Sequence, residues 1–128
     1  PFRGWKMKRC MIVDDSSVVR KVAKRILTSN DLLVAEAASA TEALTLCSAE
    51  MPDLIVVDTT LPDMATADFI REVLGYEAET KPRIVICLAE VDVGAIMRAK
   101  RAGASGYLLK PFNRPQLLER FREFQMAA

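Results

Sequence analysis

The chain has 128 residues, of which 51% are hydrophobic and 27% are charged, and its 18 basic residues nearly balance its 17 acidic ones. This composition is typical of one globular domain, and the formal net charge of +1 gives no overall attraction to nucleic acid or to an anionic membrane. No apolar run approaches the roughly 20 residues of a membrane-spanning helix, so we expect no membrane association and a cytoplasmic location. The absence of histidine excludes histidine-based acid–base catalysis, a Ser-His-Asp triad and a phosphohistidine carrier.

Short apolar runs alternate along the chain with segments of helical spacing. The runs predict five strands, at residues 10–13, 32–37, 54–57, 84–88 and 107–109. The helical spacing predicts five helices, through residues 18–27, 41–50, 67–74, 93–102 and 114–125. We expect the apolar stripes of these helices, Val18 and Val22 included, to lie in the core. Such an alternation is typical of an α/β fold with a parallel sheet covered by helices on both faces.

The domain boundary and the state of the cysteines can also be predicted from the sequence. Residues 1–6 precede Met7, and we interpret them as an upstream extension or a cloning remnant, with residues 7–128 forming the domain. Cys10, Cys47 and Cys87 belong to no CxxC or Cys/His cluster, so we expect buried, reduced thiols rather than a zinc site.

Charged residues follow three of the predicted strands. Asp14 and Asp15 follow the first, Asp58 the third and Lys110 the fifth. In open α/β sheets ligands bind beyond the carboxyl ends of the strands, so we expect these side chains to converge. Three carboxylates offer the oxygen ligands that suit Mg²⁺. With the lysine, they favour phosphoryl transfer, in which Asp58 is the nucleophile and Lys110 binds a phosphoryl oxygen.

Three motifs in these regions resemble one known family. They are Ile12–Ser16, Pro52–Asp58 with Leu61-Pro62 behind it, and Ala102–Phe112. On these motifs the sequence resembles CheY-like response-regulator receiver domains from about Lys8 to Met126. The resemblance implies a flavodoxin-like (βα)5 sandwich, with a five-stranded parallel sheet in the order 2-1-3-4-5.

The resemblance also implies roles for individual residues. Asp58 matches the phosphoacceptor, Asp15 the direct acidic metal ligand, and Asp14 its partner, which often acts through water. Thr60 matches the position whose backbone carbonyl completes the Mg²⁺ site and whose side chain tunes dephosphorylation. Lys110 matches the phosphate-binding lysine, and the family has a cis peptide bond between this lysine and the following proline.

Two positions depart from the family pattern. Leu88 stands where the family has a threonine or serine whose hydroxyl binds the phosphoryl group and draws an aromatic residue, here Tyr107, inward. The switch formed by Leu88 and Tyr107 is therefore expected to be atypical, and one phosphate hydrogen bond, worth about 1.5–3 kcal/mol, is expected to be missing. Thr66 stands where the family usually has glycine.

The resemblance implies a signalling phosphoacceptor rather than a conventional enzyme. It would receive its phosphoryl group from a sensor histidine kinase or a histidine phosphotransferase and catalyse its own phosphotransfer and dephosphorylation. Output would pass to a downstream protein through the face of the fourth helix, fifth strand and fifth helix, where Met97, Tyr107 and Leu117 offer apolar anchors beside scattered basic residues. The main alternative, favoured by Leu88, is a receiver-like interaction module that binds its partner regardless of phosphate. A small Mg²⁺-dependent phosphatase or nucleotide-binding enzyme is disfavoured because no glycine-rich phosphate loop is present.

Overall fold

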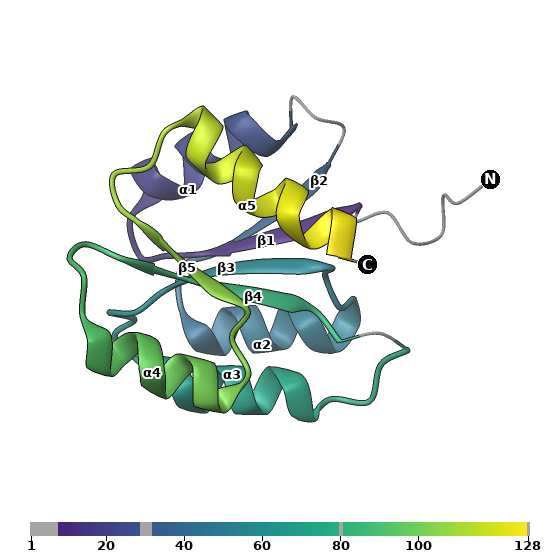
Figure 1. Cartoon of the computed structure of the whole chain (residues 1–128). Helices are drawn as coiled ribbons and strands as arrows, with labels where there is room; N and C mark the ends of the chain where they lie inside the picture. The colour runs from purple at the N-terminus through teal and green to yellow at the C-terminus, as the bar shows by residue number, and fades with distance from the viewer. Residues whose placement is uncertain (1–7, 29–31, 80, 128) are drawn as a thin grey trace.

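The computed structural model describes residues 8–28, 32–79 and 81–127, and ten elements alternate along the chain. The strands are β1 (Arg9–Val13), β2 (Leu33–Ala37), β3 (Leu54–Asp58), β4 (Arg83–Leu88) and β5 (Gly106–Leu109). The helices are α1 (Ser17–Thr28), α2 (Ala40–Ala49), α3 (Thr66–Gly75), α4 (Val93–Ala102) and α5 (Arg114–Ala127) (Figure 1). The predicted elements are all present, with ends shifted by at most two residues. Residues 1–6 lie outside the described part of the chain.

The strands form one parallel sheet in the order β2-β1-β3-β4-β5, which confirms the predicted topology. β1 lies between β2 and β3, so the chain reverses its direction of winding there. Because all five strands run the same way, their carboxyl ends share one edge of the sheet. The residues that follow β1, β3 and β5 are thereby gathered beside the switch point, where such sheets bind ligands.

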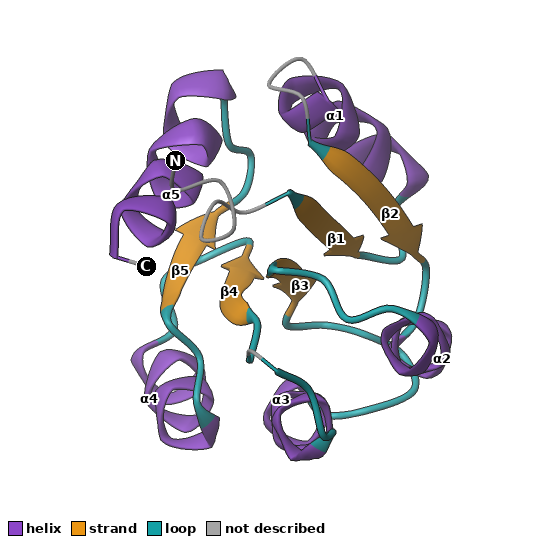
Figure 2. Cartoon of the chain, turned by 90° about the vertical axis from the view of Figure 1, so that its right-hand side faces the viewer, coloured by secondary structure: helices purple, strands orange, loops and turns teal. Residues whose placement is uncertain are grey.

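Helices cover both faces of the sheet in two layers. Figures 1 and 2 show α1 and α5 on one face and α2, α3 and α4 on the other. Side chains alternate between the faces along each strand, as the two-residue period of a strand requires. On β1, Met11 and Val13 pack in the cluster with α2, α3 and α4, while Cys10 and Ile12 pack in the cluster with α1 and α5. All four side chains are no more than 1% exposed, so this strand is buried on both sides.

Local capping explains where several helices begin and end. The Ser16 hydroxyl accepts a hydrogen bond from the Val19 N–H at the start of α1. At α2, the Ser39 hydroxyl accepts from the Glu42 N–H, and the Glu42 carboxylate accepts from the N–H of Ala38, the residue before the N-cap. Gly103 ends α4 with a φ of 122°, a conformation that residues with a Cβ rarely adopt.

Four expectations about apolar helix residues were wrong, and one of them concerns Leu46 of α2, which is 37% exposed rather than buried. Val18 and Val22 are 70% and 45% exposed, because Ala23, Ile26 and Leu27 form the face of α1 that meets the sheet. Leu117 is 1% exposed and belongs to the core, so it is no surface anchor.

The three thiols are free and buried, which confirms the expectation for the cysteines. Burial raises the pKa of Cys10 and Cys87 to about 12 and that of Cys47 to about 11. These side chains are therefore protonated at neutral pH and pack as small apolar groups. Within the described residues, no helix combines the length and hydropathy that crossing a membrane requires.

Candidate functional site

Backbone hydrogen bonds between neighbouring segments hold the ends of the strands in place. The Asp14 N–H donates to the Ala37 carbonyl, and the Lys110 N–H donates to the Leu88 carbonyl. Asp58 is the last residue of β3, and the N–H of the following residue, Thr59, donates to the Cys87 carbonyl on β4. The carboxyl edge therefore holds Asp14, Asp58 and Lys110 on a hydrogen-bonded frame rather than on loose loops.

The Lys110 ammonium joins two buried carboxylates. Its Nζ lies 3.0 Å from Oδ1 of Asp58 and 3.1 Å from Oδ2 of Asp14. Both aspartates are 2% exposed, and the lysine side chain is 20% exposed. Burial alone would lower the pKa of Lys110, but the hydrogen bonds and charges of Asp58 and Asp14 outweigh burial and raise this pKa above 10.5. Lys110 is therefore a permanent cation in contact with both acids.

Asp14, Asp15 and Asp58 form a compact oxygen cluster. One carboxylate oxygen from each lies within 4.8 Å of the others, and Asp15 is exposed while Asp14 and Asp58 are buried. Three oxygen donors with one side open to solvent fit Mg²⁺, which binds through few carboxylates and keeps several waters. The predicted metal-binding side chains thus converge, and a divalent cation would relieve their mutual repulsion.

Two threonines contact Asp58. The Thr60 hydroxyl donates to Oδ2 of Asp58 at 2.9 Å, so it touches the carboxylate itself. The role of the Thr60 backbone carbonyl in metal binding stays a prediction. Thr66, the first residue of α3, donates from its hydroxyl to the Asp58 backbone carbonyl at 3.5 Å. A glycine at position 66 would lack this hydroxyl, so this departure from the family pattern has a structural consequence.

Leu88 and Tyr107 face different surroundings. Leu88 ends β4, is 3% exposed and packs in the core cluster beneath α2, α3 and α4. Tyr107 is 37% exposed, and its backbone carbonyl accepts a hydrogen bond from Arg120 Nε at 2.9 Å.

The peptide bond between Lys110 and Pro111 is cis, as the resemblance implied.

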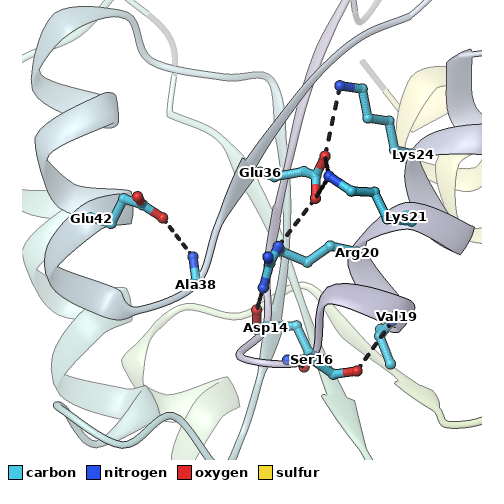
Figure 3. A network of polar contacts seen from close by, with 9 residues as sticks. All are labelled: Asp14, Ser16, Val19, Arg20, Lys21, Lys24, Glu36, Ala38 and Glu42. Carbon is cyan, nitrogen blue, oxygen red and sulfur yellow. Dashed lines mark hydrogen bonds and ion pairs between the residues drawn. The ribbon is translucent and has the colours of Figure 1, made fainter.

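A polar network behind Asp14 was not anticipated from the sequence (Figure 3). Arg20 on α1 contacts both the Asp14 backbone carbonyl and the Glu36 carboxylate on β2. The pattern of α1 placed Arg20 with Lys21 and Lys24 on a polar face, without indicating a partner. The one available signal was an acidic residue, Glu36, inside an otherwise apolar strand.

Comparisons with known proteins agree with this geometry. The model of the response regulator receiver domain family matches residues 10–122. The chain belongs to the response regulator receiver domain family. Receiver domains are signalling phosphoacceptors of two-component systems that generally bind Mg²⁺ at an acidic pocket and interact with histidine kinases and downstream targets.

Individual relatives match this receiver domain over most of their length. The chemotaxis protein CheY of Bacillus subtilis is 33% identical over 112 residues, which cover 87% of this chain and 92% of that protein. CheY of Thermotoga maritima is 33% identical over 113 residues, which cover 88% of this chain and 92% of that protein. The solved structure of the chemotaxis response regulator CheY4 of Vibrio cholerae has a TM-score of 0.85 and 28% identity, and the match covers 91% of this receiver and 98% of CheY4.

Proposed function

We propose that this receiver accepts a phosphoryl group on Asp58, with Mg²⁺ bound by Asp14, Asp15 and Asp58. The observation that supports this most directly is the contact between Lys110 and the buried Asp58 carboxylate at 3.0 Å. A cation beside a nucleophilic carboxylate is suited to bind an oxygen of the incoming phosphoryl group. When bound, Mg²⁺ would neutralise charge on the phosphoryl oxygens.

The donor is a phosphohistidine of a sensor histidine kinase or a histidine phosphotransferase. A carboxylate oxygen of Asp58 attacks the phosphorus atom, the O–P bond forms as the P–N bond breaks, and the leaving imidazole nitrogen takes up a proton. Lys110 binds a phosphoryl oxygen, and the Thr60 hydroxyl holds the second oxygen of Asp58 in place. Attack of water on the phosphorus later breaks the O–P bond to Asp58, releases inorganic phosphate and restores the free carboxylate. The Thr60 hydroxyl, which contacts this carboxylate, lies close enough to influence the rate of that step.

Phosphorylation then changes a protein-interaction surface formed by α4, β5 and α5. Exposed apolar side chains on this face support the proposal, since Met97 is 46%, Tyr107 37% and Leu109 38% exposed. Lys100 and Arg101, in the last turn of α4, add positive charge. A downstream protein with an apolar and acidic surface matches this face, and we place the process in the cytoplasm.

Intact-mass measurement tests the central step. Wild-type protein incubated with Mg²⁺ and acetyl phosphate is expected to gain one phosphoryl group, and Asp58→Asn is expected to gain none. Asp68→Asn is the matched control, because Asp68 is an exposed aspartate on α3 that pairs with Arg71. No mass gain in the wild type, or an equal gain in Asp58→Asn, would overturn the proposal.

A second candidate is an interaction module whose binding ignores phosphate. Leu88 favours it, because an apolar side chain at this position cannot bond a phosphoryl oxygen and couple it to Tyr107. The two candidates differ in one measurement, the affinity for the downstream partner with and without acetyl phosphate. Equal affinity in the wild type under both conditions supports the module, and a difference that Asp58→Asn abolishes supports the phosphorylation switch.

A further inference from the structure

Arg20 bridges the acidic loop and the edge strand β2. Its Nη1 donates to the Asp14 backbone carbonyl at 2.7 Å, and its Nε donates to Oε1 of Glu36 at 3.1 Å. Figure 3 shows the guanidinium lying between these two acceptors. The side chains of Arg20 and Glu36 are only 15% and 14% exposed. A guanidinium group that is buried to this extent and bonded to two acceptors is held in one orientation.

Glu36 is itself held by cations from α1. Lys21 Nζ lies 2.9 Å from Oε2 and 3.1 Å from Oε1 of Glu36, and Lys24 Nζ lies 3.7 Å from Oε2. The carboxylate therefore has three basic neighbours on one helix. Its position sets the direction in which Arg20 extends toward Asp14.

The contact from Arg20 is one of four hydrogen bonds that hold Asp14. The Asp14 N–H donates to the Ala37 carbonyl, Oδ1 accepts from the Ser16 N–H, and Oδ2 accepts from Lys110. The backbone carbonyl of Asp14 accepts a hydrogen bond from Nη1 of Arg20. This carbonyl belongs to the planar peptide unit that continues into Asp15, so holding it also orients the Asp15 backbone.

We propose that Arg20, oriented by Glu36, is a positioning residue that holds the Asp14–Asp15 peptide in the geometry that divalent cation binding requires. This inference rests on the proposed function, because it concerns the Mg²⁺ site of that proposal. Arg20 touches neither the cation nor the phosphoryl group. It acts through the backbone that presents two of the three carboxylates.

A positioning role and a purely electrostatic role predict opposite changes in Mg²⁺ affinity when Arg20 is replaced. Removing a positive charge near three carboxylates strengthens their attraction for Mg²⁺ if only the electric field matters. Removing a group that orients metal ligands weakens metal binding, by about tenfold or more. The sign of the change in affinity therefore separates the two explanations.

Calorimetric titration with MgCl₂ measures this sign directly. Arg20→Met is expected to bind Mg²⁺ about tenfold more weakly than the wild type. Arg25→Met is the matched control, since Arg25 is an exposed arginine on the same helix, and it is expected to bind as the wild type does. Equal or tighter binding by Arg20→Met overturns the inference, including when its melting temperature falls. Absence of Mg²⁺ binding by the wild type overturns the proposed function and this inference with it.

Two further variants test the mechanism. Arg20→Lys keeps the charge but lacks the planar fork that reaches both acceptors, so its affinity is expected to lie between those of wild type and Arg20→Met. If Arg20→Met does not fold, Arg20→Lys becomes the test. A Mg²⁺ affinity of Arg20→Lys equal to that of the wild type then overturns the inference. The substitution Glu36→Gln is expected to weaken Mg²⁺ binding when Arg20 is present and to cause no further loss when it is added to Arg20→Met. If the effects of the two substitutions on Mg²⁺ affinity add in the double variant, the role assigned to Glu36 is overturned.

Discussion

The Lys110 ammonium lies 3.0 Å from Oδ1 of Asp58, although 52 positions separate the two residues in the chain. The same ammonium lies 3.1 Å from Asp14, which is 96 positions away. Such contacts require β1, β3 and β5 to end at one edge of the sheet. The proposed chemistry depends on this convergence, and so does part of the stability of the fold.

Replacement of Lys110 by methionine is expected to destabilise the protein and abolish phosphoryl transfer. The variant leaves two buried carboxylates without their cation, so the free energy of unfolding at neutral pH is expected to fall by about 2 kcal/mol without Mg²⁺. Adding Mg²⁺ is expected to restore more stability to the variant than to the wild type. Urea unfolding measures both values, with the exposed Lys100→Met as the control. A variant as stable as the wild type without Mg²⁺ would contradict the expectation.

Glu36 is expected to make stability depend on pH in the acidic range. Hydrogen bonds from Lys21 and then Arg20, opposed by burial, lower the pKa of Glu36 below its ordinary value of 4.5. Because the folded pKa is the lower one, the stabilisation is present above pH 4.5 and is lost as the pH falls through the folded pKa. Urea unfolding of Glu36→Gln over this window is expected to show a shallower loss of stability than the wild type. Parallel curves for the two proteins would count against this contribution.

Replacement of Leu88 by threonine tests the atypical switch. The hydroxyl is expected to couple phosphorylation to Tyr107, so that acetyl phosphate shifts the NMR signals of the Tyr107 ring more in this variant than in the wild type. Loss of apolar volume at a buried position is expected to lower the free energy of unfolding by about 2 kcal/mol. Leu88→Val has nearly the shape of threonine without the hydroxyl, and it is expected to lose stability without gaining the coupling. Similar Tyr107 shifts in both variants would refute the assigned role of the hydroxyl.

Asp63 is expected to tie the loop after β3 to the start of α2. Its carboxylate accepts hydrogen bonds from the N–H groups of Ala40 and Thr41 and from the Thr41 hydroxyl, and the bonds from Thr41 and Ala40 lower the pKa of Asp63. Asp63→Ala is therefore expected to speed amide hydrogen exchange at Ala40 and Thr41 and to lower the melting temperature. Exchange rates at these two amides that match the wild type would show that the contact is dispensable in solution.

The exposed valines of α1 show where prediction from sequence reached its limit. Val18 and Val22 recur at helical spacing with Ile26, and this spacing correctly predicted the helix. A helix on a sheet buries only one strip of its surface, however, and the apolar residues of α1 cover a wider arc than that strip. Which part of the arc turns inward depends on how α1 docks against its neighbours, so the exposure of Val18 and Val22 was missed.

By itself the sequence determined the local features of this protein. Continuous apolar runs determined the strands, helical spacing determined the helices, and the acidic pair and the lysine at strand ends indicated the site. These signals are local, because periodicity and turn chemistry act over a few residues.

Only the tertiary structure decided which side chains meet. It brought Arg20 to the Asp14 carbonyl and Glu36, placed the Thr60 hydroxyl on Asp58, and buried Leu117 while exposing Val18. Such contacts follow from the order and register of the strands and from the docking angle of each helix. These are set by the packing of the whole domain at once, so no single segment of the sequence encodes them.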